Sequence, residues 1–140
     1  MGVLTALTGV RGAVLSAVLP LSLLAQPAMA VDLPSGLSPD LSEVLVDQVG
    51  LQTWLRFRFV VPQIGQDATD ALSFDQIKDD FPVMCAHLAL PYMSKYDLTA
   101  DIIVISFADR HVEFGVSDPD ATQYFEQFRS ENGDCIWEAF

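Results

Sequence analysis

Hydrophobic and polar residues alternate along two neighbouring stretches, residues 43–49 and 52–62. A period of two is typical of strands with one buried face, and Gly50-Leu51 between them fits a two-residue turn with glycine first. The pattern therefore predicts a β-hairpin. Its register sets apolar pairs on the core face and oppositely charged side chains on the other: Val44–Phe57, Val46–Leu55, Glu43 opposite Arg58, and Asp47 diagonal to Arg56.

A helix is predicted after the polar loop at residues 62–72. Ser73 and Gln76 make a capping box, after which apolar residues recur at helical spacing. Pro82 either kinks this helix or stands in the first turn of a regular part that begins near Asp80, and Pro91 is expected to end it.

The near-continuous apolar run at residues 101–107 is rich in β-branched residues, which predicts a buried central strand. A turn at residues 108–110 and a short strand at residues 111–115 are expected next.

The tail allows two interpretations. Asp118-Pro119 could cap a helix over residues 119–129, or residues 122–130 form a strand that turns at Asn132-Gly133 into a second strand at residues 135–140. We favour the hairpin, because Asn-Gly between aromatic runs is a strong short-range turn signal. In its register Phe128 faces Trp137 and Ser130 faces Cys135.

These elements predict an α+β fold, an antiparallel sheet with one main helix packed on one face. Cys85 and Cys135 are the only two cysteines in the chain. An even count in an exported chain predicts a disulfide. The two cysteines would meet if the helix that carries Cys85 packs on the sheet face that carries Cys135.

Export is indicated by the first thirty residues. They carry Arg11 but no acid, a mainly apolar and uncharged run at residues 13–25, and a small-x-small site that ends at Ala30. The predicted organisation is a signal peptide at residues 1–30, an extended N-terminal arm at 31–41, and a single disulfide-linked domain at 42–140. The predicted location is the periplasm or the medium, reached by the general secretory route, with no stable membrane insertion after cleavage.

The charge excludes some partners. The chain has 7 Lys and Arg against 19 Asp and Glu, a formal charge of -12 at pH 7. All the acids follow Ala30, so cleavage there leaves 6 basic residues against 19 acids, or -13. Nucleic-acid binding needs clustered Lys and Arg, so this class is excluded, as is electrostatic docking on anionic lipid.

Several segments resemble a family of short, exported, uncharacterised proteins of alphaproteobacteria, especially the rhodobacter-type bacteria. The segments that carry this resemblance are residues 43–47, 54–59, 85–92, 104–110, 113–115, 118–125 and 133–138. The resemblance implies an exported location and a disulfide, and no site residues. Some relatives bear the name acetolactate synthase, which does not fit, because enzymes that use thiamine diphosphate are several times longer and need an acidic cofactor-binding motif absent here.

Two groups of side chains are candidates for a binding surface. Trp54, Arg56 and Arg58 make a cationic and aromatic stripe that could grip an anionic ligand or a partner chain, or could pair with the acids across the hairpin. Asp109, Arg110 and His111 form a dense polar turn.

Two alternatives involve chemistry. His111 with Asp109 or Glu113 could act as a general base in a small hydrolase, although no nucleophile motif accompanies it. Met84, His87 and Met93 could handle copper as soft ligands. No phosphate loop, H-E-x-x-H or C-x-x-C motif occurs, so no cofactor or metal is predicted. The sequence thus favours a non-catalytic binding or envelope-accessory module that contacts an envelope protein or a small ligand.

Overall fold

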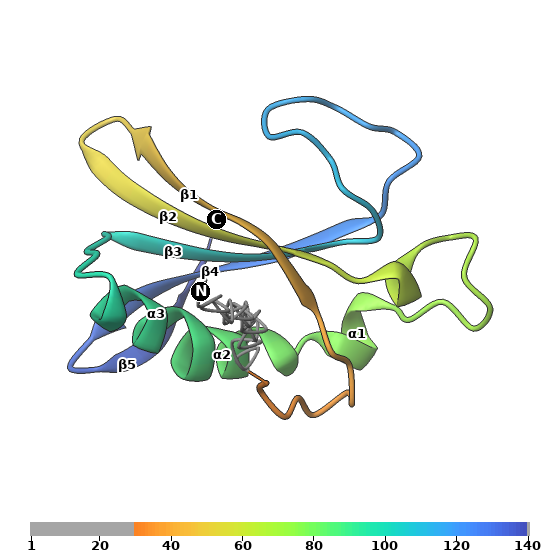
Figure 1. The fold of residues 1–140 in the computed structure, drawn as a ribbon, viewed down its shortest axis with the longest axis horizontal. Helices are drawn as coiled ribbons and strands as arrows, with labels where there is room; N and C mark the ends of the chain where they lie inside the picture. Colours follow the sequence, from red (N-terminus) through yellow and green to blue (C-terminus); the bar gives the residue numbers. More distant parts are fainter. Residues whose placement is uncertain (1–29, 140) are drawn as a thin grey trace, which may run out of the picture.

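A five-stranded sheet with helices on one face forms the fold in this computed structural model, which describes residues 30–139 (Figure 1). The strands, in their order across the sheet, are β1 (Asp40–Val49), β2 (Gln52–Val60), β3 (Ile102–Ala108), β4 (Gln123–Glu131) and β5 (Asp134–Glu138). The helical elements are η1 (Pro62–Ile64), α1 (Phe74–Ile77), α2 (Asp80–Met84), η2 (Cys85–Ala89) and α3 (Leu90–Lys95). The α+β prediction, with one main helical segment on one face, is confirmed. The predicted signal peptide lies outside the described residues except for Ala30.

The sheet is mixed rather than wholly antiparallel. Its β1–β2, β3–β4 and β4–β5 pairs are antiparallel, whereas β2 and β3 run parallel. The parallel pair arises because the helical segment carries the chain across the sheet face and returns it to the end where β2 began. β3 is central and buried along its whole length, as its apolar run predicts.

The β1–β2 hairpin has the predicted register, with Val44 opposite Phe57 and Glu43 opposite Arg58. β1 begins at Asp40, earlier than expected, and a register shift between Leu41 and Glu43 interrupts its pairing. Val46 pairs with Leu55 but is 61% exposed, so its predicted burial is wrong. The turn end of the hairpin curls away from the helices (Figure 1).

The tail is a hairpin, and the alternative helix over residues 119–129 is wrong. Phe128 pairs with Trp137 and Ser130 with Cys135, as predicted. Asn132 and Gly133 both have positive φ, at 53° and 81°, as a two-residue turn of this kind requires. The disulfide is also confirmed, because Cys135 and Cys85 are bonded with their Cα atoms 6.2 Å apart.

Pro91 does not end the helical segment, contrary to the prediction. α2 begins at Asp80 with Pro82 in its first turn, which was one of the two expected arrangements. A π-helical turn, η2, then precedes Pro91, and the Leu90 N–H bonds the carbonyl of Cys85. The wider turn accommodates a residue that lacks an N–H and clashes with the carbonyl four residues before it, so the helix continues to Lys95.

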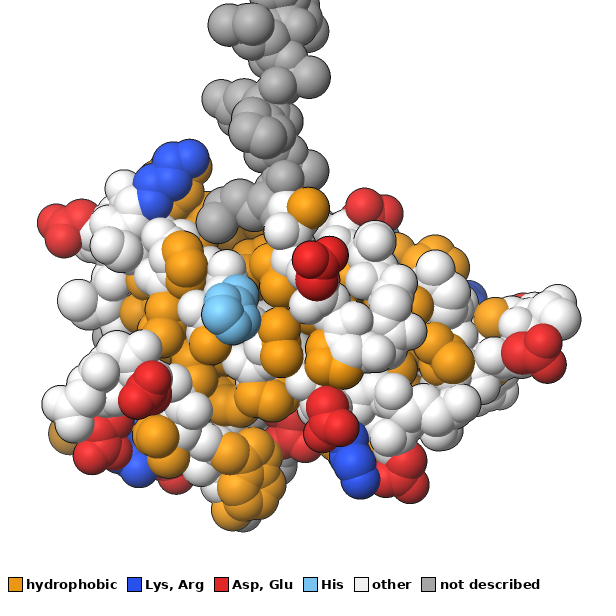
Figure 2. Space-filling model, turned by 90° about the horizontal axis from the view of Figure 1, so that it is seen from below, with side chains coloured by type: hydrophobic (Ala, Val, Ile, Leu, Met, Phe, Trp, Pro, Cys, Tyr) orange, Lys and Arg blue, Asp and Glu red, His pale blue; other side chains and the backbone are white. Residues whose placement is uncertain are grey.

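The core lies between the helical segment and one face of the sheet. Aromatic rings dominate it, with Phe81 stacked on Phe107 at 4.6 Å between centroids. Seen from the helical side, apolar side chains cover the middle of the surface and most charges lie toward the margin (Figure 2). No helix within residues 30–139 is long and apolar enough to cross a membrane.

The N-terminal arm is fastened to the helical segment. Leu33 and Leu37 are buried in the core. Ser35 donates from its backbone N–H, at 3.0 Å, and from its hydroxyl to the fully buried carboxylate of Asp80. Two donors therefore compensate the burial of this charge at the start of α2.

Candidate binding groove on the open face of the sheet

One loop, residues 109–122, rises over part of the sheet face opposite the helices (Figure 1). The strand predicted at residues 111–115 is absent, because these residues turn away from the sheet after β3 and form part of this loop. The floor beneath is nevertheless largely buried: Val104, Ser106 and Gln127 are 3%, 5% and 6% exposed. Long side chains of β2 and the loop shield it where no helix does.

A groove of about 190 Å³ lies between the loop and the sheet. Its floor comes from β2, β3 and β4, and its upper wall from the loop. The lining residues are Arg56, Arg58, Val104, Ser106, Val112, Glu113, Phe114, Gly115, Val116, Gln123 and Phe125. Guanidinium, hydroxyl and amide groups thus meet aromatic and aliphatic walls, a composition typical of small-ligand sites.

Arg56 contacts two aromatic rings and one carboxylate. Its Nε and Nη2 donate to the carboxylate of Asp47 at 3.0 and 2.9 Å. Its guanidinium carbon is 4.9 Å from the ring centre of Trp54 and 5.2 Å from that of Phe114. The predicted diagonal ion pair is therefore present, and it leaves Nη1 without a partner among residues 30–139.

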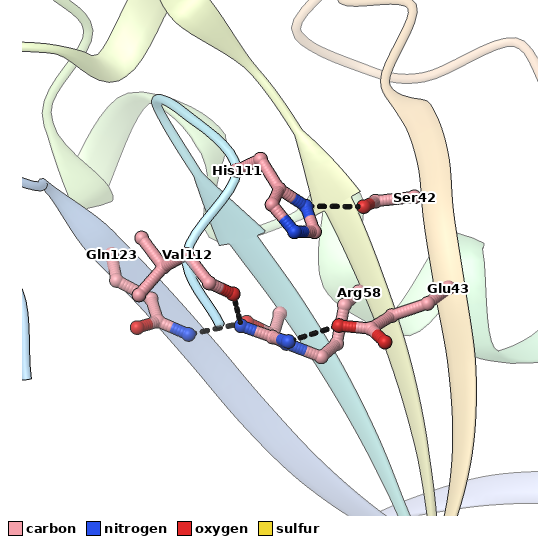
Figure 3. A network of polar contacts seen from close by, with 7 residues as sticks. Ser42, Glu43, Arg58, His111, Val112 and Gln123 are labelled. Atoms are coloured by element: carbon pink, nitrogen blue, oxygen red, sulfur yellow. Dashed lines mark hydrogen bonds and ion pairs between the residues drawn. The ribbon is translucent and has the colours of Figure 1, made fainter. Parts of the chain in front are cut away.

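Arg58 joins three parts of the molecule (Figure 3). Its Nη1 pairs with Glu43 on β1, and its Nη2 donates to the carbonyl of Val112 in the loop at 2.6 Å. Beside it, the Gln123 amide donates to the Ser106 hydroxyl at 2.8 Å. Since only 9% of Arg58 is exposed, these bonds fix both the loop and the groove floor.

Phe114 docks the loop onto the two arginines. Its ring centre is 5.2 Å from the Arg56 guanidinium carbon and 5.7 Å from that of Arg58, so it contacts both cations while staying 47% exposed. Cation–π contacts of this kind contribute about 0.5–1 kcal/mol each at exposed sites.

Asp109 closes the base of the loop. Its Oδ1 accepts the Thr122 N–H at 2.9 Å, its Oδ2 accepts both Nε and Nη2 of Arg110, and its own N–H bonds the Thr122 carbonyl. Burial acts to raise the pKa of Asp109, but the bonds from Arg110 and Thr122 together outweigh it, so the pKa lies below its ordinary value. Gly65 leaves the space for this carboxylate, because a Cβ there would lie 2.8 Å from Oδ2.

His111 contacts Ser42 on β1, at 3.1 Å between Nδ1 and Oγ, rather than Asp109 (Figure 3). No local pattern pairs these two residues, which are 69 positions apart. The hollow beside them measures about 10 Å³, which holds no more than a water molecule. The contact joins the loop to β1.

The residues of the copper hypothesis do not share one accessible surface. Met84 and Met93 are buried, whereas His87 is exposed, and the neighbouring Cys85 is consumed by the disulfide. No group of three His, Cys, Asp or Glu side chains within the described residues could hold a metal ion.

The sequence-derived binding residues lie on the open face or in its loop. Arg56 and Arg58 line the groove, and Trp54 stacks on Arg56. Asp109 and Arg110 stand at the loop base instead. Sequence reasoning missed Phe114 and Gln123, because their place in the groove depends on how the loop folds back.

The sequence profile of a family described as Family of unknown function (DUF6497) matches residues 16–140. No curated protein and no solved structure matches the chain.

Proposed function

Because the chain belongs to DUF6497, a family of unknown function, we propose its function from the groove itself: it is an exported, non-catalytic binding module. The observation that carries the proposal is the groove between the 109–122 loop and the open sheet face, with two guanidinium groups between apolar walls. The loop is fixed at its base by Asp109 and at its middle by Arg58, so the groove exists before a ligand arrives.

The lining favours a small apolar ligand that carries a carboxylate. Phe114, Phe125 and Val116 offer apolar contact, and Nη1 of Arg56, which has no partner within residues 30–139, can donate to an anion. A volume of about 190 Å³ suits a single ring or a branched aliphatic group with its carboxylate. Glu113 also lines the groove but is exposed, so its charge is hydrated.

Export is supported by the disulfide, since bonds of this kind persist in oxidising compartments. The signal peptide over residues 1–30, the periplasmic or secreted location and the alphaproteobacterial relatives stay predictions from the sequence. A partner in the envelope is part of the same proposal.

The proposal does not include general-base chemistry by His111 with Asp109. Both carboxylate oxygens of Asp109 are occupied by Thr122 and Arg110, so they do not orient His111. The hollow beside His111 and Ser42 is also too small for a substrate.

Titration of the ¹⁵N-labelled protein with benzoate tests the groove. We expect shifts confined to amides of residues 104–106, 112–116 and 123–125, with a millimolar Kd, and none with the cation benzylamine. Arg56→Gln should weaken benzoate binding about fivefold, which is about 1 kcal/mol.

Arg129→Gln is the matched control. Arg129 is also on the open face and pairs with Glu131 and Glu138, but it does not line the groove. Equal weakening by both substitutions, or shifts spread over the surface, would contradict the proposal.

A further inference from the structure

Within residues 30–139 no strand pairs with the outer edge of β1, and this edge offers a second surface, separate from the groove. β1 spans Asp40–Val49 and is the first strand in the sheet order, so β2 pairs with one of its sides only. The opposite edge strand, β5, covers only Asp134–Glu138. β1 contains no lysine or proline, residues that commonly block strand edges, and its one irregularity is near its start, between Leu41 and Glu43.

Alternate residues of β1 direct their backbone groups outward. The two-residue turn makes Val49 and Gln52 a hydrogen-bonded pair, so Gln48 and Thr53 are a non-bonded pair. The bonds of Thr53 agree: its N–H donates to the Asp101 carboxylate and its C=O accepts the Asp101 N–H, both away from β1.

By the same alternation, the outward N–H and C=O groups belong to three residues: Val44, Val46 and Gln48. An added strand would therefore find a regular row of donors and acceptors.

The side chains beside this edge differ between the two faces. On the helical face Val44 is half-buried and Val46 is 61% exposed, so apolar surface continues past the helices. On the open face Glu43 uses Oε1 for Arg58, and Asp47 uses Oδ2 for Arg56. Their second oxygens, Oε2 and Oδ1, have no partner within the described part of the chain.

From this edge we propose that β1 binds an extended segment of another protein, in which apolar residues alternate with lysine or arginine. The apolar side chains would cover Val44 and Val46, and the cations would contact Glu43 and Asp47 from the outer side. Backbone pairing supplies affinity, and the alternation supplies specificity.

Charge favours this partner over a second copy of the chain. Residues 31–140 carry a formal charge of -13, so self-association is opposed by repulsion. Two β1 strands paired antiparallel would also bring the carboxylates of Glu43 and Asp47 from both copies to one side of the junction. A basic segment is attracted by the same charges.

A seven-residue peptide that alternates lysine and valine is the probe. Its addition to the full chain should slow amide hydrogen exchange at Val44, Val46 and Gln48. At low salt it should bind about tenfold more tightly than a peptide alternating glutamate and valine, and 0.5 M NaCl should reduce that preference.

Two substitutions at one position separate backbone pairing from side-chain contact. Val46→Pro removes an outward N–H without breaking a bond to β2, and should weaken peptide binding about tenfold or more. Val46→Thr keeps the N–H and should weaken it less than about threefold. The exchange measurement on the unmutated protein decides the question if the proline variant does not fold.

Three results would overturn the inference. These are equal binding of the two peptides, unchanged exchange at the three amides on peptide addition, and protection of those amides by dimerisation without peptide.

A variant of the groove separates the two proposals. Arg56→Gln is unsuitable because it also removes a partner of Asp47, so Phe125→Ala is used instead. It should leave peptide binding intact, which distinguishes failure at the groove from failure at the edge.

Discussion

Arg58 shows how one side chain can couple three separate segments. It bonds Glu43 on β1 and the Val112 carbonyl in the loop while its own backbone belongs to β2. A buried guanidinium needs such partners, because an unpaired charge in a poorly hydrated site costs several kcal/mol. The edge strand and the loop are therefore fixed by the same residue.

Asp109 gives a pH-dependent test at the residue scale. Its pKa is lowered in the folded protein, so its stabilisation is complete above the unfolded pKa of about 3.9 and is lost as pH falls through the folded value. Asp109→Asn should reduce the free energy of unfolding by about 1–3 kcal/mol at pH 7. Urea unfolding between pH 7 and pH 3 should show the difference from the unmutated protein shrinking below about pH 4.

The control for this series is Asp75→Asn. The Asp75 side chain is 86% exposed and pairs with the exposed Lys78 at 3.4 Å, so its substitution should change stability little at any pH. A constant difference for Asp109→Asn across the pH range would mean that its charge does not hold the loop.

Phe114 tests how the loop is held at the scale of an element. Phe114→Ala removes both arginine contacts but leaves the bonds of Asp109 and of the Val112 carbonyl. We expect amides 113–116 to exchange at least about tenfold faster, with a loss of global stability of at most about 1 kcal/mol.

Val116→Ala is the matched substitution, since Val116 is 55% exposed in the same loop. It should leave exchange unchanged. Equal exchange rates for both variants would show that the arginine contacts do not order the loop.

The sequence predicted elements well where one local signal was sufficient. The alternation from Leu55 to Phe59 identified β2, and Asn132-Gly133 identified the terminal hairpin with its register. Both signals act within a few residues. The pairing of Arg56 with Asp47 followed from the hairpin register alone.

Errors occurred where distant parts of the chain decide the outcome. Proline normally ends a helix, and a local pattern does not reveal that a π-helical turn accommodates Pro91. The parallel pairing of β2 with β3 depends on where the helical crossover leaves the chain. His111 meets Ser42, and Phe114 meets the arginines, only after the sheet has formed.

The disulfide links two elements that are far apart in sequence, and its removal is a further test. Cys85 lies in η2 and Cys135 in β5, 50 positions apart in the sequence. A loop of that length contributes about 4 kcal/mol through restriction of the unfolded chain. The double variant Cys85→Ala/Cys135→Ala should lose about that much in urea unfolding, and the unmutated protein in reductant should match it. Equal stability of the oxidised and reduced protein would contradict the estimate.

At the scale of the whole molecule, the charges are unevenly distributed. Of the basic side chains, Arg56, Arg58, Arg110 and Arg129 lie on the open face or its loop, each paired with an acid. Many of the other acids in residues 30–139 form no ion pair within that range, so the folded domain concentrates unbalanced negative charge on the rest of its surface. Compaction brings these charges together, which lowers the stability of the folded state.

Salt should therefore stabilise this protein. Raising NaCl from 0.01 to 0.5 M shortens the screening length from about 30 Å to a few Å, which weakens repulsion between distant acids more than it weakens half-buried pairs such as Arg58–Glu43. We expect Tm to rise by about 4 °C, corresponding to roughly 1 kcal/mol, in scanning calorimetry. The triple variant Asp32→Asn/Asp70→Asn/Asp120→Asn removes three exposed acids that form no ion pair within residues 30–139. It should be more stable at low salt, and its Tm should respond less to added salt. A Tm that falls with salt would instead show that the ion pairs outweigh the repulsion, and the preference of β1 for a basic segment would lose its electrostatic basis.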